Sequence, residues 1–575
     1  MSTEILSFLI INGKDSMLAV KNHRKIDTSA FALVRYDRLI CHHEKMKFLW
    51  RYVILLVLFV IASLRSKRGR LFFSYGRDCF VRTLSLLAMT AKKQLFCFKG
   101  FTGYLVQKTY ILTIAVLFAM SIMFGGCASN LTGYYKNLRT KIDSGDYEAA
   151  AKFVDKSKSK YGSKNILMYY LDSGIITHFA NDYKTSSKRF ESAKEKFEEY
   201  YQKSITAGAL SMIFNDGTMP YYGQNFERVY IPIFEALDYI LLGQDNEAVV
   251  EARQIDTLFK TFGVEKNYKN FYKDDGFIRY FMGLVYENAG YLNDAHISYY
   301  KALKAYKNGI VEIVPPKELV NDAYTSALVL GMSDRALEIK RDYPKAQRNI
   351  IPEGYGECIV VDYNGFVPKK VDNVFEFALS DMWAYVGHVE VSGEEQQDFD
   401  KAKSIGISLF ANNYVKVVFP KYEEIKNEII SFKVQSNGCE TSGILVQNLG
   451  QIACKCLDDD IKKIYAKTIA RAAVKYVVGK CVSKTVEDKA GSGWGSLSQI
   501  SFNLFNSLSE TADKRAWNTL PDTILMARFC LPAGMHILQV DFLGKQGEVL
   551  QSCNVEINVK TGKKNFFVVR SSKID

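Results

Sequence analysis

Few residues of this chain have the type and spacing needed for metal binding or catalysis. Cys454 and Cys456 form a Cys-x-Cys pair, but a zinc site needs four ligands, and no second cysteine pair or nearby histidine completes the set. On a helix the two thiols would point about 200° apart. The pair is therefore interpreted as two core cysteines, and we expect no metal and no cofactor.

A glycine-rich run, Gly491 to Ser496, looks at first like a phosphate-binding loop. Ser496 stands where the third glycine should be, and no Lys-Ser or Lys-Thr follows. A flexible loop that presents Trp494 to a partner or a glycan is the expected interpretation. The four histidines after Cys127 stand alone, and the chain has neither an H-E-x-x-H motif nor a G-x-S-x-G elbow. The sequence thus predicts a protein that is not an enzyme.

One cysteine has a different context. An apolar run, Tyr110 to Gly126, follows Lys108 and ends in two glycines and Cys127. A short basic region, an apolar core and small residues at a cut site are typical of a secretory signal. The segment from Phe124 onward resembles the bacterial lipobox, in which the cysteine takes a diacylglyceryl thioether, although leucine is usual at the place of Phe124. We expect Cys127 to be the lipid attachment site and residues 108–126 to be the signal peptide.

The residues that follow the cysteine suggest which membrane the anchor uses. Under the sorting rule of enteric bacteria, Ala128 and Ser129 favour the outer membrane over the inner one. The expected location is therefore the cell envelope, on its periplasmic side, with the membrane itself as one partner.

Residues 1–107 read poorly as a domain. They hold an apolar run, residues 48–64, and precede the signal sequence, which should stand at the start of a protein. A mis-assigned start, with residues 1–107 as a non-native extension, is the economical explanation. The alternative is a two-span membrane protein that uses both apolar runs.

The positive charge lies in that extension. Residues 1–107 carry 18 Lys and Arg against 6 Asp and Glu, and Lys108 adds one more, which accounts for the whole net charge of +13. Residues 128–575 are therefore neutral. A neutral body has no basic stripe to neutralise phosphates, so nucleic acid is excluded as a partner.

Residues 127–345 are expected to form a helical repeat domain of the tetratricopeptide (TPR) type. Helix-period segments of about 12 to 18 residues alternate with short turns. The TPR pattern has small residues at positions 8 and 20, aromatics at 11 and 24, and alanine at 27. Its best matches are Gly174, Ser186, Phe190 and Ala193, and then Gly283, Tyr286, Ala295, Tyr299 and Ala302; weaker ones are Gly145 to Ala149 with Phe153, and Ala236, Tyr239, Ala248 and Ala252.

A polar and aromatic stretch, Asn215 to Tyr230, interrupts the repeat register. It could be a binding loop in which Tyr221 and Tyr222 contact a partner, because loops on scaffolds often carry function. The alternative is a long connection between helices that packs its own aromatic rings.

The remaining residues alternate between strand and helix patterns. Residues 346–520 are expected to form an α+β segment with strands at Glu357–Tyr363 and Ile405–Phe419. Residues 521–575 show four strands separated by turns and are expected to form a small antiparallel β-sandwich. The predicted fold class is α+β: a TPR-like repeat module, an α+β segment and a C-terminal sandwich.

Several short motifs are similar to an uncharacterised family of bacterial repeat-containing envelope lipoproteins. They are Asp513 to Pro521, Ala527-Arg528, Leu531 to Gly534, Asn215-Asp216, Glu227-Arg228 and Glu251 to Arg253. The resemblance covers residues 127–570 approximately. It implies a periplasmic lipoprotein and supplies no catalytic residues.

The leading hypothesis is a lipid-anchored, non-enzymatic scaffold that binds another envelope protein through the concave face of its repeats. An envelope hydrolase acting on cell-wall glycan or peptide is the first alternative, and it predicts a deep pocket with convergent carboxylates. The two-span membrane protein is the second.

Overall fold

The computed structural model describes residues 131–206, 219–264, 272, 274–378, 414–462, 464–465, 468 and 512–573. All of them belong to one of the two units of the chain, Ala128–Asp575. The predictions for Cys127, Trp494 and the two apolar runs lie outside the described residues. Within these residues, no helix combines the length and apolarity that a membrane span requires.

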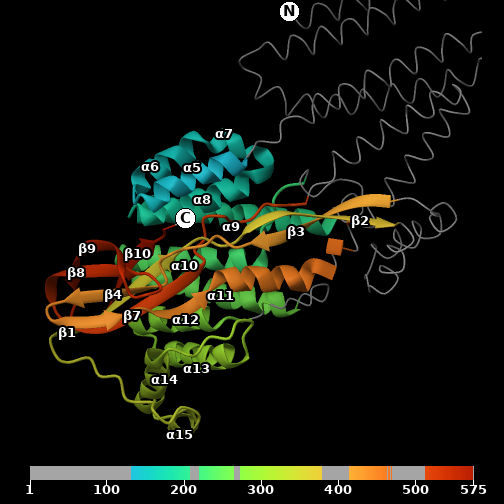
Figure 1. Cartoon of the computed structure of the whole chain (residues 1–575). Coiled ribbons are helices and arrows are strands. Elements are labelled where there is room, and N and C mark those ends of the chain that lie inside the picture. Colours follow the sequence, from blue (N-terminus) through green and yellow to red (C-terminus); the bar gives the residue numbers. More distant parts are fainter. Residues whose placement is uncertain are drawn as a thin grey trace, which may run out of the picture. The chain divides into compact units, whose positions relative to one another are not determined.

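Helices come first in this unit and pack as consecutive antiparallel pairs (Figure 1). The pairs are α5 (Leu131–Asp143) with α6 (Tyr147–Lys156), α8 (Ile166–Phe179) with α9 (Tyr183–Thr206), α10 (Asn225–Leu241) with α11 (Asp245–Val264), α12 (Gly276–Asn288) with α13 (Leu292–Asn308), and α14 (Lys317–Val329) with α15 (Ser333–Asp342). A short helix α7 (Lys158–Tyr161) and a 3₁₀ turn η1 (Ser163–Asn165) connect α6 to α8.

Each pair is closed by a three-residue turn whose middle residue is left-handed. That residue is Gly145, Asn181, Gly243, Gly290 or Gly331, with φ between 60° and 86°. The amide of the next residue donates to a carbonyl five residues back, as Gln244 N does to Tyr239 O at 2.7 Å. This 6→1 bond closes a Schellman motif, which favours glycine because no Cβ opposes the left-handed backbone. The sequence therefore ends each first helix by the same local chemistry.

Close contact between the two helices of a pair follows the predicted TPR positions. A Cβ placed on Gly174 would lie 2.7 Å from the ring of Phe190, and one placed on Gly283 would lie 2.3 Å from the ring of Tyr299. The same 16-residue spacing joins buried residues in the other pairs: Leu138 with Val154, Ala236 with Ala252, and Ala323 with Ile339. The described helices form a helical repeat, and α14 and α15 belong to it, within the predicted range of residues 127–345.

The interrupting stretch is shorter than predicted. Helix α10 begins at Asn225, so Asn225 to Tyr230 are helical rather than part of a loop, while residues 207–218 lie outside the described part. Gln224 and Glu227 form a capping box at this start.

The strands follow the helices in the chain. They are β1 (Tyr355–Asn364), β2 (Lys369–Ala378), β3 (Tyr414–Glu423), β4 (Ser431–Ser436), β5 (Cys439–Ser442), β6 (Ile444–Asn448), β7 (Thr523–Pro532), β8 (Gly534–Leu543), β9 (Val549–Val559) and β10 (Lys564–Ser571). One sheet has the order β10-β1-β7-β6, a second has β5-β4-β8-β9, and β2 pairs with β3 alone.

The expected independent sandwich of residues 521–575 is not what the described strands form. The four predicted strands exist, but β7 and β10 join the first sheet, on either side of β1, while β8 and β9 join the second sheet with β4. Strand β10 also runs parallel to β1, with Glu357 opposite Lys564. The boundary at 520/521 therefore does not separate two modules, because pairing between distant strands leaves no local sequence signal.

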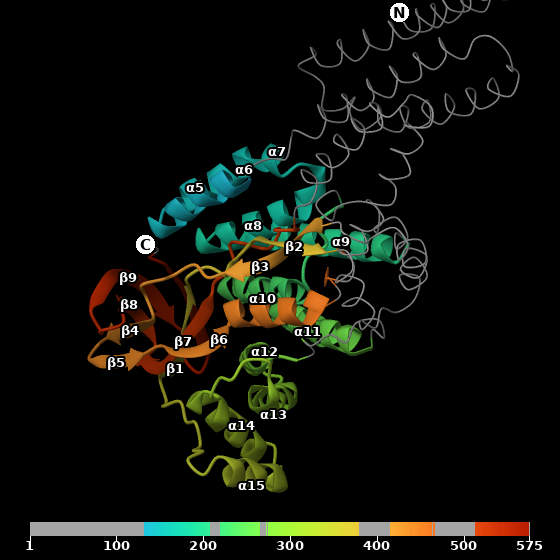
Figure 2. The same cartoon turned by 45° about the vertical axis from the view of Figure 1, so that its right-hand side comes forward.

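Two hydrophobic cores result. One lies between the two four-stranded sheets and contains Val360, Phe432, Leu525 and Val540. The other fills the repeat and continues into the opposite side of the first sheet, where Ile359, Tyr363 and Phe566 lie. Strands β1, β7 and β10 accordingly run beside α8, α10 and α12 (Figures 1 and 2).

Candidate functional site

The first helices of the middle pairs turn one face toward the strands, and we call this the inner face of the repeat. Four buried carboxyl groups lie on it, one from each of α8, α10, α12 and α14: Asp172, Glu227, Asp275 and Asp322. They are between 1% and 6% exposed. Buried carboxyl groups need partners, so their hydrogen bonds show what the inner face binds.

Asp172 of α8 accepts three hydroxyl hydrogen bonds. Thr519 Oγ1 donates to Oδ1 at 2.7 Å, and Tyr161 and Tyr135 donate to Oδ2 at 2.7 and 2.8 Å. Burial raises the pKa of Asp172 to about 6, although the three hydroxyl donors oppose the shift. The α8 carboxyl group thus joins the repeat to the segment just before β7.

Glu227 of α10 binds the same segment. The Trp517 amide donates to Oε1 at 2.8 Å, while Tyr221 Oη and the Gln224 amide donate to Oε2 at 2.5 and 2.9 Å. Burial raises the pKa of this carboxyl group. Tyr221 is only 3% exposed, so its role is to hold Glu227, and its side chain is not available to a partner.

Asp275 caps the N-terminus of α12 and holds strand β6. Its Oδ1 accepts from the Ile278 amide at 2.9 Å, and Gln447 Nε2 donates to its two oxygens at 2.8 and 2.7 Å. One carboxyl group therefore begins a helix and fixes a strand.

Asp322 of α14 belongs to a buried ionic cluster. Arg528 of β7 contacts both Asp322 and Glu357 of β1, and Lys564 of β10 donates to Glu357 at 2.7 Å. Burial alone would raise the pKa of Glu357, but Arg528 and Lys564 lower it to about 2. Glu357 is therefore charged and lies between two bases where the repeat meets three strands.

The inner face is thus occupied by the chain's own strands and by the segment that precedes β7. The prediction that this face binds a partner is not met by the described surface, because its four buried carboxyl groups already have partners within the chain. These carboxyl groups are also covered rather than gathered in an open pocket, as the hydrolase alternative required.

The residues that carry the family resemblance make these contacts. Trp517, Thr519 and Arg528 bind the carboxyl groups of the repeat, and Glu227 is one of those groups. Arg515 also donates to Met219 O at 2.7 Å, across the same boundary. In this structure the motif residues join the two halves of the unit, which gives them a structural role.

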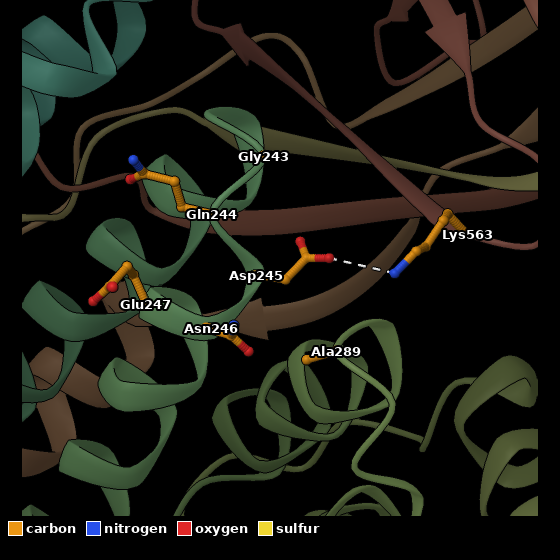
Figure 3. Close-up of a pocket in the computed structure, with 7 residues that line it drawn as sticks. All are labelled: Gly243, Gln244, Asp245, Asn246, Glu247, Ala289 and Lys563. Atoms are coloured by element: carbon orange, nitrogen blue, oxygen red, sulfur yellow. Dashed lines mark hydrogen bonds and ion pairs between the residues drawn. The ribbon is translucent and has the colours of Figure 1, made fainter.

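An open recess of about 440 Å³ lies where three turns meet (Figure 3). The α10–α11 turn and the first residues of α11 supply Gly243 to Glu247, the α12–α13 turn supplies Ala289, and the β9–β10 turn supplies Lys563. Lys563 Nζ lies 3.4 Å from Asp245 Oδ2 and donates to Asn288 O at 2.9 Å. Gln244, Asn246 and Glu247 are exposed around this pair.

The recess can form hydrogen bonds but shows no catalytic arrangement among its lining residues. Its lysine is paired with Asp245, and no hydroxyl, thiol or imidazole group lines it. Its exposed amide and carboxylate side chains can donate and accept hydrogen bonds. No local sequence pattern marks the recess, since its residues come from three separate stretches of the chain.

Three other residues that the sequence singled out, Tyr222, Cys454 and Cys456, lie among the described residues. Tyr222 is partly buried, with its ring edge against Tyr200 at 5.9 Å. Cys454 and Cys456 lie on a described helical stretch, residues 449–462, and Cys456 packs against the larger core. Burial raises the pKa of the Cys456 thiol to about 12.

The sequence alone assigns no role to the four inner-face carboxyl groups, although one of them stands in the Glu227-Arg228 motif. Only Asp172 had a visible signal, because it is the sole acid in the otherwise apolar run Ile166–Phe179. The other three lie among charged neighbours, so nothing in the sequence separates them from surface acids.

Comparison with known proteins adds little. No family model matches the chain, and no curated protein is similar to it. Among solved structures, YrrB, a TPR protein with an unusual peptide-binding site, is 15% identical, with 40% of this chain and 94% of that chain covered and a TM-score of 0.22. BtubC from P. vanneervenii is 11% identical, with 37% and 81% covered and a TM-score of 0.24. The apo form of RapI is 12% identical, with 47% and 72% covered and a TM-score of 0.28. Such low scores carry no weight, so the repeat assignment rests on the helix geometry.

Proposed function

We propose that the protein is a lipid-anchored scaffold of the bacterial cell envelope, attached through Cys127 on the periplasmic side, with the outer membrane favoured over the inner one. It binds another envelope protein without catalysing a reaction. The observation that carries the binding role is a stack of five helix pairs whose inner face is closed by the chain's own strands. Such a stack is a rigid support that presents its turns and outer helices.

The polar recess at Gly243 to Glu247 and Lys563 is the proposed contact with the partner. It combines exposed hydrogen-bonding groups from turns that the stack holds in place. The sequence predicted that the inner face of the repeat would bind the partner. Because that face is covered, the recess takes its place as the expected binding surface.

The anchor is tested by mass spectrometry of the N-terminal peptide of the mature protein from a membrane fraction. The expected product begins at Cys127 and carries two or three acyl chains. Peptides from residues 1–100 in the mature protein would instead support the two-span alternative.

The proposed contact between the recess and the partner protein is tested by site-specific photocrosslinking of the full chain in membranes. A photoreactive amino acid at Asn246, in the recess, is expected to capture one main protein. The same amino acid at Lys345, which is exposed beyond α15, serves as the control. The Glu247→Lys substitution should reduce capture at Asn246 several-fold. Equal capture at both positions, or no effect of Glu247→Lys, would count against the recess.

A further inference from the structure

We propose that the edge of the repeat formed by α6 and α7 docks onto anionic phospholipid headgroups. This inference rests on the lipid anchor of the proposed function and adds the surface that faces the membrane. Residues 152–164 contain five lysines against one aspartate, while residues 128–575 as a whole are neutral. All five lysines are exposed, and we call the four on α6 and α7, which are Lys152, Lys156, Lys158 and Lys160, the basic edge.

The basic edge lies beside the beginning of α5. The rings of Tyr134 and Phe153 stack at 5.3 Å, and Tyr161 Oη donates to Tyr134 Oη at 2.7 Å. Lys160 Nζ is 5.9 Å from the centre of the Tyr134 ring. Tyr134 belongs to the first turn of α5, so Lys160 lies beside the start of that helix.

The start of α5 is also where a lipid anchor would act. In the sequence, residues 128–130 alone separate Cys127 from Leu131. Such a connection spans at most about 14 Å, which is comparable to the screening length of about 10 Å at 0.1 M ionic strength. An acylated Cys127 would therefore hold these lysines within reach of the surface potential of an anionic leaflet.

Acidic neighbours do not cancel the charge of the basic edge. The aspartate of this segment, Asp155, accepts from Arg189 Nη2 at 3.2 Å and from Tyr169 Oη at 2.7 Å. Lys152 forms an exposed pair with Glu148 at 3.3 Å, which water and salt weaken.

Aromatic rings lie among the lysines. Lys158 Nζ is 5.5 Å from the ring centre of Tyr170, and Lys160 Nζ is 5.8 Å from that of Phe153; both rings are partly exposed. Cations beside partly exposed rings are typical of surfaces that lie in the headgroup region of a membrane. Charge, rings and the position beside the anchor favour a lipid surface over an acidic protein.

The test uses the full chain, inserted into vesicles of phosphatidylglycerol or of phosphatidylcholine and treated with an amine-reactive reagent. Peptide mass spectrometry gives the reaction rate of each lysine. We expect Lys152, Lys156, Lys158 and Lys160 to react at least three-fold more slowly on phosphatidylglycerol, and the difference to vanish in 0.5 M salt. Lys545, exposed in the β8–β9 turn, should react equally on both vesicles.

A charge-reversal variant tests whether the edge acts as one surface. In the triple variant K156E/K158E/K160E, the remaining Lys152 should lose its protection on phosphatidylglycerol. The matched control K345E/K545E/K560E makes the same change in charge at exposed lysines elsewhere. It should leave the protection of Lys152 unchanged.

The mass of the N-terminal peptide from the same sample separates the two proposals. Acylated Cys127 with equal lysine rates on both lipids would overturn the docking surface and leave the anchor in place. Protection on phosphatidylglycerol without acylation would support the docking surface and remove the anchor. Protection in crude membranes but not on pure lipid would assign the edge to an acidic protein and overturn the proposal.

Discussion

Asp172 is buried among hydroxyl groups, and its ionisation should leave a mark on stability. Its pKa rises from an ordinary value of 3.8 to about 6 on folding, mainly because of burial. The folded protein therefore binds the proton more tightly than the unfolded chain. It follows that the stability this group provides below about pH 4 is lost as the pH rises through about 6.

Replacement of Asp172 by asparagine should remove this pH dependence. The amide oxygen can accept from Tyr135 and Tyr161, and the amide nitrogen can donate to the Thr519 hydroxyl, which can reverse its role. Between pH 4.5 and 7, we expect the wild type to lose about 2 kcal/mol of unfolding free energy relative to the variant. Urea unfolding at several pH values measures this. Parallel curves for the two proteins would contradict the assignment.

Arg528 is expected to contribute far more to stability than an exposed basic residue. Its side chain is 2% exposed, and Arg528→Met would leave Asp322 and Glu357 with Lys564 as the remaining buried base. Uncompensated buried charge costs about 3–5 kcal/mol. Thermal unfolding should show this loss.

The matched control for Arg528 is Lys514→Met, which breaks an ion pair with Asp372 whose side chains are 47% and 31% exposed. Exposed pairs contribute about 0–1 kcal/mol. Similar losses in the two variants would mean that the buried cluster does not hold the halves of the unit together.

Two glycines within helices can separate the effect of close packing on stability from the effect of helix propensity. In α12, a Cβ on Gly283 would lie 2.3 Å from the Tyr299 ring, so Gly283→Ala should cost about 1–3 kcal/mol through overpacking. In α5, Gly133 has nothing within 4 Å, so Gly133→Ala should stabilise by about 0.5–1 kcal/mol through helix propensity. Chemical denaturation measures both. Stabilisation by both substitutions would refute close packing in the fourth pair.

The helices were predictable because their signals are local. Turn residues such as Gly290 and pairs such as Gly283 with Tyr299 lie within one repeat, so a single stretch of sequence shows them. The strands of the last part were also visible, because alternation in Leu538, Val540 and Phe542 is local. What could not be seen was the pairing of β10 with β1, whose residues Lys564 and Glu357 are 207 positions apart.

The candidate site was less predictable than the helices, because its contacts join residues that are far apart in the sequence. Tyr221 was selected as an aromatic residue in a loop, but whether it meets solvent depends on Glu227 and on a segment about 300 residues later. The recess depends on Asp245, Ala289 and Lys563, which only the folded unit brings together. Burial and convergence are properties of the tertiary structure, and a single sequence contains neither directly.

For the whole molecule, the described contacts make the repeat and the sheets parts of one cooperative unit. The larger core passes from the helices into the first sheet, and the four inner-face carboxyl groups find partners on the strands or in the segment before β7. A protein cut at residue 345 would therefore expose apolar surface and deprive these carboxyl groups of the partners that the strands and the segment before β7 supply.

We expect residues 128–345 alone to be poorly soluble or to unfold without a cooperative transition, whereas residues 128–575 should unfold in one step. Circular dichroism melting and hydrogen exchange of the two fragments measure this, and exchange should be faster in α8, α10 and α12 of the shorter one. Adding residues 346–575 as a separate chain should restore slow exchange in those helices if the inner face is built for these strands. A shorter fragment that melts as cooperatively as the longer one would show that the repeat is stable alone. Its inner face would then be free to exchange the chain's own strands for a partner.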